Sequence, residues 1–153
     1  MKDSVVGIGV VGAGSIGIRS ALEHFHLDDV QDKARIVAIC DTVPERAKAA
    51  ADKYGIPAWY GSYEELLEDV NVDAVTLCSP IGFHYAQAVM ALKAGKHIHS
   101  NQTITTTVPE IDDIIRLAGE KRLKVVASPG MMLLPYNQRM RRAVLEGRLG
   151  QLM

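Results

Sequence analysis

Three glycines near the start of the chain have the spacing of a phosphate-binding turn. Gly12, Gly14 and Gly17 form Gly-x-Gly-x-x-Gly directly after an apolar run over residues 5–11. In this pattern the first glycine allows a tight turn, the second lets backbone approach a pyrophosphate, and the third allows close helix packing. A helix beginning near Ser15 would direct its free N–H groups at the phosphates. The expected contacts with a dinucleotide are Gly12, Ala13, Gly14, Ser15, Ile16 and Gly17.

An acidic residue, Asp41, follows the last glycine at the distance expected for a carboxylate that holds the adenine ribose hydroxyls. A carboxylate accepts from these hydroxyls but repels a 2′-phosphate, so the sequence favours NAD over NADP as the cofactor. Thr42 is expected beside it. A plain helix cap is the alternative role for this pair, and the two roles are compatible. Arg46 would weaken the preference against NADP, although an arginine in a helix is more often solvated.

Strand and helix patterns alternate along the chain. Strands are predicted over residues 4–11, 35–40, 58–60, 73–78, 96–99 and 123–127. Helices are predicted over residues 15–27, about 44–54, a short segment after 62, about 83–94, about 108–121 and about 135–146. Helix-length segments between strands imply right-handed crossovers. We therefore expect an α/β fold of three layers, a doubly wound parallel sheet of the Rossmann type with at least six strands.

Helix boundaries carry local signals as well. Residues 42–45, 62–65 and 107–110 each read as a capping box, with Ser or Thr followed three residues later by Glu. Gly95 has the position of a glycine that ends a helix.

Ligands of open parallel sheets bind at the carboxyl ends of the strands, so the loops there are candidate sites. After the strand over 73–78, a Ser-Pro pair ends the strand and the next helix begins near the ligand. His84 in its first turn is either a donor to the ligand or a packed histidine, and the sequence leaves both open. The expected cofactor contacts of this loop are Cys78, Ser79, Pro80 and His84.

Composition excludes several classes of protein. The 153 residues suit one domain, and 48% hydrophobic and 23% charged residues are ordinary for a globular protein. A net charge of −1 gives no reason to expect nucleic acid or an anionic membrane as partner, and no apolar run is long enough to span a bilayer. Residues 1–11 do not read as a signal peptide. Cys40 and Cys78 each end an apolar strand, which predicts buried free thiols, no metal and a cytoplasmic protein.

The sequence resembles the Gfo/Idh/MocA family, the relatives of glucose–fructose oxidoreductase and inositol dehydrogenase, over essentially its whole length. The matching segments are VVGAGSIG at 10–17, ICD at 39–41, YGSYEELL at 60–67, VDAV at 72–75, CSP at 78–80 with His84, and ALKAGKHI at 91–98. The resemblance implies an amino-terminal NAD(P) domain whose partner domain, a mainly antiparallel sheet, supplies much of a sugar site. Asn101 is added to the expected cofactor contacts.

Three departures from the family fall where the reaction is expected. The family's usual Glu-Lys-Pro is here Asn101-Gln102-Thr103, so Gln102 occupies the position of the lysine that touches substrate and nicotinamide. A glutamine can hydrogen-bond a sugar hydroxyl but cannot carry a proton. Ile81 stands where the family tends to have Asn, and 132–133 is Met-Leu where Arg-Phe is common. Gln102 is the one predicted catalytic residue.

Residues 1–130 are expected to form the dinucleotide-binding domain. Residues 131–153 resemble the family's bridging helix and the start of a second α+β domain that this chain lacks, so we expect an excerpt of a longer protein. The expected function is NAD-dependent hydride transfer to or from a sugar, polyol or derivative, in a homo-oligomer when the second domain is present. An NAD-binding regulator or scaffold without dehydrogenase activity is the alternative, which Gln102 favours. A lyase or hydrolase-like enzyme that uses NAD transiently is a third possibility.

Overall fold

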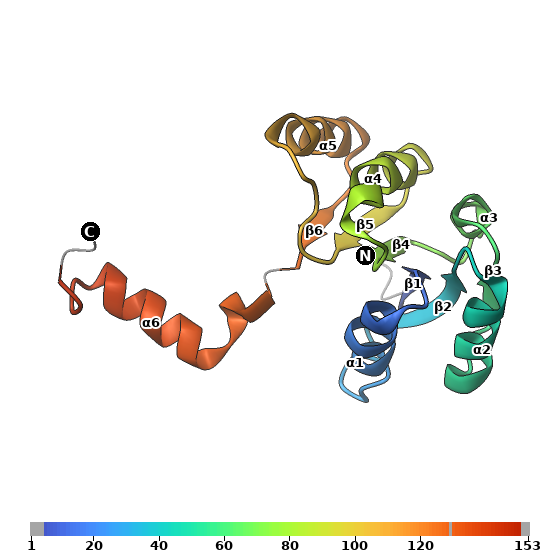
Figure 1. The fold of residues 1–153 in the computed structure, drawn as a ribbon, viewed down its shortest axis with the longest axis horizontal. Helices are drawn as coiled ribbons and strands as arrows, with labels where there is room; N and C mark the ends of the chain where they lie inside the picture. Colours follow the sequence, from blue (N-terminus) through green and yellow to red (C-terminus); the bar gives the residue numbers. More distant parts are fainter. Residues whose placement is uncertain (1–4, 129, 151–153) are drawn as a thin grey trace.

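Six parallel strands form one sheet in the computed structural model, which describes residues 5–128 and 130–150 (Figure 1). The strands are β1 (Val6–Val11), β2 (Ala34–Cys40), β3 (Ala58–Tyr60), β4 (Ala74–Leu77), β5 (His97–Ser100) and β6 (Val125–Ala127). Their order is β3-β2-β1-β4-β5-β6, and every neighbouring pair is parallel. This is the doubly wound order of dinucleotide-binding domains, so the predicted fold is confirmed. The predicted first strand also included residue 4, which lies outside the described residues.

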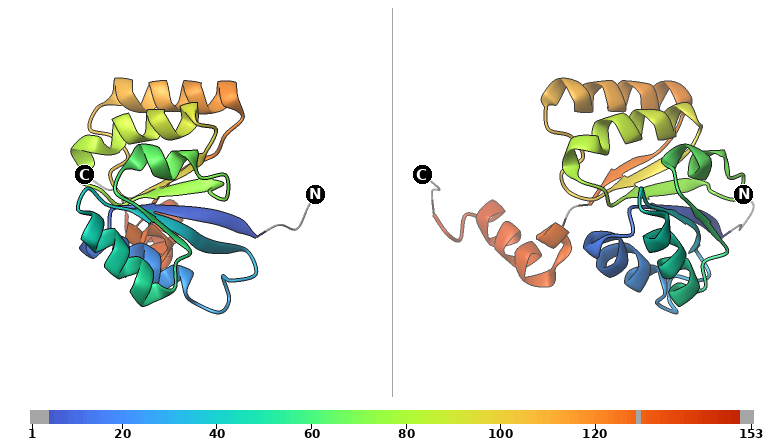
Figure 2. Two further views of the ribbon diagram at one scale, coloured as in Figure 1. Left: turned by 90° about the vertical axis from the view of Figure 1, so that its right-hand side faces the viewer. Right: turned by 45° about the vertical axis from the view of Figure 1, so that its right-hand side comes forward.

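Helices cover both faces of the sheet, as Figure 2 shows. One face carries a π-helical segment (Gly17–Leu22) that continues into α1 (Glu23–Phe25), together with α2 (Pro44–Tyr54). The other face carries α3 (Tyr63–Glu68), α4 (His84–Lys93) and α5 (Val108–Lys121). The helical turns after the glycine motif run over residues 15–25, two residues shorter than predicted.

The alternation of side chains along a strand divides the core into two parts. Val10 of β1 packs with Leu22 and Ile39 beneath α1 and α2, whereas Val11 packs with Leu77 and Ile98 beneath α3, α4 and α5. Since both faces of β1 are buried, its sequence reads as a continuous apolar run rather than an alternating one.

Two of the three predicted capping boxes cap a helix. Thr107 accepts from the amide of Glu110, whose carboxylate bonds back to the Thr107 amide, and Ser62 accepts from the amide of Glu65. The box at residues 42–45 is wrong: the N-cap of α2 is Val43, with no side-chain cap. Pro44 takes the first helical position, so the helix begins one residue later than the box requires.

The last described segments extend away from the sheet (Figures 1 and 2). A 3₁₀ turn (Gly130–Leu133) leads into α6 (Pro135–Leu145), which buries none of its side chains. Tyr136, Met140 and Val144 form an exposed apolar stripe at helical spacing on α6. Over the described ranges, no helix is long and apolar enough to cross a membrane.

Candidate functional site

A cleft of about 610 Å³ opens at the carboxyl ends of β1, β2 and β4. At the carboxyl end of the sheet, the strand order reverses between β1 and β4, and this point is the usual ligand site of the fold. Its lining includes most of the predicted cofactor residues. The lining residues are Val11, Gly12, Gly14, Ser15, Ile16, Cys40, Asp41, Thr42, Arg46, Tyr63, Cys78, Ser79, Pro80, Phe83 and Gln87.

The glycine loop has the geometry that the motif predicts. Gly12 has φ +101°, which L side chains rarely adopt, and its backbone packs against that of Cys78. A Cβ added at Gly17 would lie 1.9 Å from the carbonyl oxygen of Gly12, so the helix can approach the loop only because residue 17 has no side chain. A Cβ at Gly14 would meet nothing within 4 Å, because this residue faces the open cleft. The loop therefore leaves room for a phosphate at Gly14.

Asp41 ties the glycine loop to the loop after β2. Its Oδ2 accepts from the amide of Ala13 at 2.8 Å, and its Oδ1 accepts from the amide of Val43 at 2.9 Å. Each carboxylate oxygen retains a second lone pair, so the group can still accept from two hydroxyls in the cleft. Arg46 lines the same part of the cleft from the first turn of α2 and is exposed.

The opposite wall of the cleft is built from α3 and α4. The hydroxyl of Ser79 donates to Oε1 of Gln87 at 2.5 Å, and the hydroxyl of Tyr63 donates to the backbone carbonyl of Gln87 at 2.9 Å. The amide nitrogen of Gln87 can then donate to a ligand in the cleft. Phe83 adds an exposed aromatic ring to this wall.

The two thiols in the cleft are protonated and weakly nucleophilic. Burial raises the pKa of Cys40 to about 12, and burial also raises the pKa of Cys78. Both are free, as predicted, but only Cys40 is buried as expected, since Cys78 is half-buried. In the part of the chain that the structure describes, no three His, Cys, Asp or Glu side chains are placed to share a metal ion. Neither cysteine is therefore an activated nucleophile.

Four predicted cofactor residues lie outside the lining. Ala13 and Gly17 are buried behind the glycine loop, where they hold its shape. His84 is 1% exposed, with both ring nitrogens facing carbonyl oxygens, so the packed alternative is the one that the structure shows. Asn101 is half-buried in the loop after β5, and its backbone N–H donates to the carbonyl of Leu77.

Gln102, the predicted catalytic residue, is exposed in the loop after β5. Its side-chain oxygen lies 2.8 Å from the position of a Cβ at Gly130, so the amide rests on the start of the 3₁₀ turn that leads to α6. Its role in catalysis stays a prediction.

Some lining residues had no sequence signal of their own. Tyr63 and Gln87 project from helices whose positions depend on packing, and Val11 and Cys40 read as strand residues of the core. The rule that ligands bind at strand carboxyl ends points to Cys40, whereas nothing local points to Gln87.

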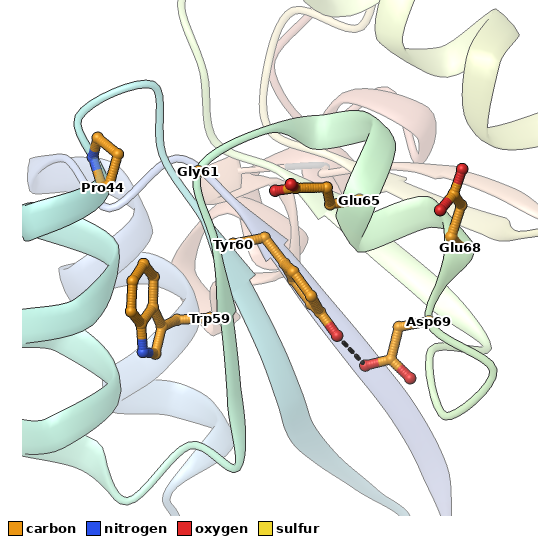
Figure 3. A pocket seen from close by; sticks show the side chains of 7 residues that line it. All are labelled: Pro44, Trp59, Tyr60, Gly61, Glu65, Glu68 and Asp69. Carbon is orange, nitrogen blue, oxygen red and sulfur yellow. Dashed lines mark hydrogen bonds between the residues drawn. The ribbon is translucent and has the colours of Figure 1, made fainter.

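A second hollow lies at the edge strand β3 (Figure 3). Trp59 and Tyr60 line it together with three acidic side chains, and the Tyr60 hydroxyl donates to Asp69 at 3.1 Å. It contains no residue of the glycine loop or of the loops after β4 and β5. The hollow is separate from the cleft described above.

The chain matches known proteins over most of its length. Residues 6–128 match the model of an oxidoreductase family with an NAD-binding Rossmann fold, GFO_IDH_MocA. It is 31% identical over 133 residues to the inositol 2-dehydrogenase of Salmonella paratyphi B, which covers 86% of this chain and 37% of that protein. It is 33% identical over 108 residues to the myo-inositol 2-dehydrogenase of Thermotoga maritima, covering 71% of this chain and 31% of that protein. The chain thus spans about a third of the length of these relatives.

Solved structures agree with this match. A 3-ketoreductase from Actinomadura kijaniata in complex with NADP and TDP-benzene superposes with a TM-score of 0.86 at 26% identity, over 94% of this chain and 43% of that one. The WlbA dehydrogenase from Chromobacterium violaceum, in complex with NADH and UDP-GlcNAcA, gives a TM-score of 0.85 at 25% identity, over 98% of this chain and 42% of that one. With the glycine loop, Asp41 and the open cleft, these matches show that the chain belongs to the Gfo/Idh/MocA oxidoreductase family and forms its NAD(P)-binding Rossmann domain.

Proposed function

We propose that this chain binds NAD in an oxidoreductase that transfers a hydride between the nicotinamide and a sugar, polyol or related derivative. The observation that carries the proposal is the cleft in which the open backbone at Gly14 and the carboxylate of Asp41 face the same space. The relatives named as inositol dehydrogenases support a polyol as the substrate class. The cofactor, when bound, supplies the hydride chemistry.

NAD is proposed over NADP because of the charge of Asp41. Its carboxylate can accept from both ribose hydroxyls, but a 2′-phosphate at this place would bring two anions together. Arg46 lines the same part of the cleft and is the cation that would counter this repulsion. The solved neighbours include complexes of both kinds, one with NADP and one with NADH.

Gln102 is proposed to orient a substrate hydroxyl beside the nicotinamide. The amide can donate and accept hydrogen bonds, but it cannot accept the proton that leaves an oxidised alcohol. That proton therefore passes to another group or to water. Residues 131–153 are proposed to connect this domain to a second one that completes the substrate site.

Titration of the chain with NAD and with NADP tests the cofactor, and NADH formation with a panel of inositols and sugars tests the reaction. We expect tighter binding of NAD and activity with a cyclic polyol in the protein that carries both domains. Tighter binding of NADP would overturn the cofactor assignment. In the full protein, Gln102→Ala should weaken substrate binding and lower turnover at unchanged NAD affinity, and a variant with unaltered kinetics would place Gln102 outside the site.

A further inference from the structure

His84 joins two loops that lie at the ends of different strands. It is the first residue of α4 and is 1% exposed. Its Nδ1 lies 2.7 Å from the carbonyl oxygen of Thr103, in the loop after β5. Its Nε2 lies 2.8 Å from the carbonyl oxygen of Ser79, in the loop after β4. The width of one imidazole ring therefore sets the separation of the two loops.

Both groups that face the ring are acceptors only. A carbonyl oxygen has no proton to give, so each contact is a hydrogen bond only when the facing ring nitrogen carries a proton. The hydroxyl of Ser100, 3.4 Å from Nδ1, donates instead to the carbonyl of Asn101 at 2.9 Å. A neutral ring donates through one nitrogen only, so it donates to one of the two loops and contacts the carbonyl of the other; only a ring with a proton on each nitrogen donates to both. A side chain that only filled space here would lose the hydrogen bond that ties the ring to a loop carbonyl.

The two loops carry different parts of the candidate site. Ser79 lines the cleft and holds the side chain of Gln87. The other loop carries Gln102, immediately before the carbonyl of Thr103 that His84 binds. The side chain of Gln102 is exposed and lies against Gly130. The contact of His84 with the backbone carbonyl of Thr103 is a further support of this loop.

We propose that His84 is a positioning residue: its contacts with the carbonyls of Ser79 and Thr103 hold the loop of Gln102 beside the loop that lines the cofactor cleft, and so fix where the nicotinamide end of a bound dinucleotide lies. The inference rests on the proposed function in one respect, that the Gln102 loop faces the nicotinamide. His84 itself does not reach the cleft, so it acts through the loops and not on the ligand.

Binding of whole and truncated cofactor tests this role. His84→Phe keeps an aromatic ring but removes both ring nitrogens. We expect the Kd for NADH to rise about tenfold, on the order of one or two lost hydrogen bonds, while the Kd for ADP-ribose, which lacks the nicotinamide, changes less than about twofold. The emission of bound NADH should move toward that of the free molecule. His97→Phe is the matched control, since His97 lies at the other end of β5, where its Nδ1 accepts from the amide of Lys124.

Equal losses of affinity for NADH and ADP-ribose would mean that His84 only stabilises the fold. Unchanged affinity for both would mean that the position of the Gln102 loop does not depend on His84. Either result overturns the proposal. If His84→Phe does not fold, ¹H–¹⁵N spectra of the wild-type chain decide: the ring of His84 should show a slowly exchanging N–H proton, and a ring whose N–H exchanges as fast as that of an exposed histidine overturns the two-loop arrangement. A wild-type chain that binds neither ligand would defeat the proposed function, while the spectra would still test the contacts of the ring.

Discussion

The carboxylate of Asp41 accepts a hydrogen bond from the backbone amide of Ala13 across the two loops that hold a dinucleotide in this fold. The distance between donor and acceptor is 2.8 Å, and the second oxygen of the same carboxylate accepts from the amide of Val43. One side chain therefore shapes the glycine loop, begins the turn into α2 and presents negative charge to the cleft. Its structural role and its proposed role in cofactor binding are compatible, but a substitution affects both.

Asp41→Asn separates the charge of this side chain from its size. The amide can accept from only one of the two backbone N–H groups, so we expect a loss of about 1–3 kcal/mol in the free energy of unfolding. The NAD affinity should fall about tenfold, or 1.4 kcal/mol, whereas the NADP affinity should hold or rise because the anion is gone. Titration with both cofactors measures the ratio of the NAD affinity to the NADP affinity. Asp52→Asn, in the exposed Lys48–Asp52 pair of α2, is the control, and an unchanged NAD/NADP ratio in Asp41→Asn would contradict this role of the charge.

Substitution by alanine should lower the stability of the protein at Gly17 and its NAD affinity at Gly14. Gly17→Ala places a methyl group against the carbonyl of Gly12, so we expect a loss of about 3 kcal/mol or more in unfolding free energy. Gly14→Ala meets open space, so its stability should stay within about 0.5 kcal/mol. Its NAD affinity should nevertheless fall at least about tenfold, because the methyl group takes the place where a pyrophosphate approaches. Chemical denaturation and NAD titration of both variants test these two predictions. A Gly14→Ala variant with normal NAD affinity would contradict the placement of a phosphate at this loop.

Alanine substitution of the two threonines that precede helices α5 and α2 should change the free energy of unfolding by different amounts. Thr107 accepts from the amide of Glu110, so Thr107→Ala should cost about 1 kcal/mol. Thr42 makes no cap for α2, so Thr42→Ala should change the free energy of unfolding by less than about 0.5 kcal/mol. Urea denaturation of the two variants measures the difference. Equal losses would mean that Thr42 caps α2 after all.

Local patterns in the sequence were enough to predict the fold and one half of the cleft. The glycine loop could be found from the spacing of its glycines, and Asp41 from its distance along the chain after the last glycine. The loop after β4 could be found because ligands bind at strand carboxyl ends. Gln87 could not be found, since its place in the wall follows from the packing of α4 and from the hydroxyl of Ser79. For His84 the sequence left two roles open, because its partners are backbone carbonyls that carry no signature in the sequence.

His99 should make the stability of the domain depend on pH. It lies on β5 with Nδ1 2.7 Å from the hydroxyl of Thr76, and burial lowers its pKa from the ordinary value of 6.5. The unfolded chain therefore binds a proton on this ring at a pH where the folded chain does not, so stability is lost as the pH falls below 6.5 toward the lower folded pKa. Between about pH 8 and 5, where histidines titrate, the Tm of the wild type should fall more than that of His99→Gln. Thermal melts across this range measure the difference, with His24→Gln on the exposed surface as the control. Other titrating groups are common to all three proteins, so they cancel in the comparison. If the wild type and His99→Gln lose stability in parallel on acidification, the buried ring is not the group that responds.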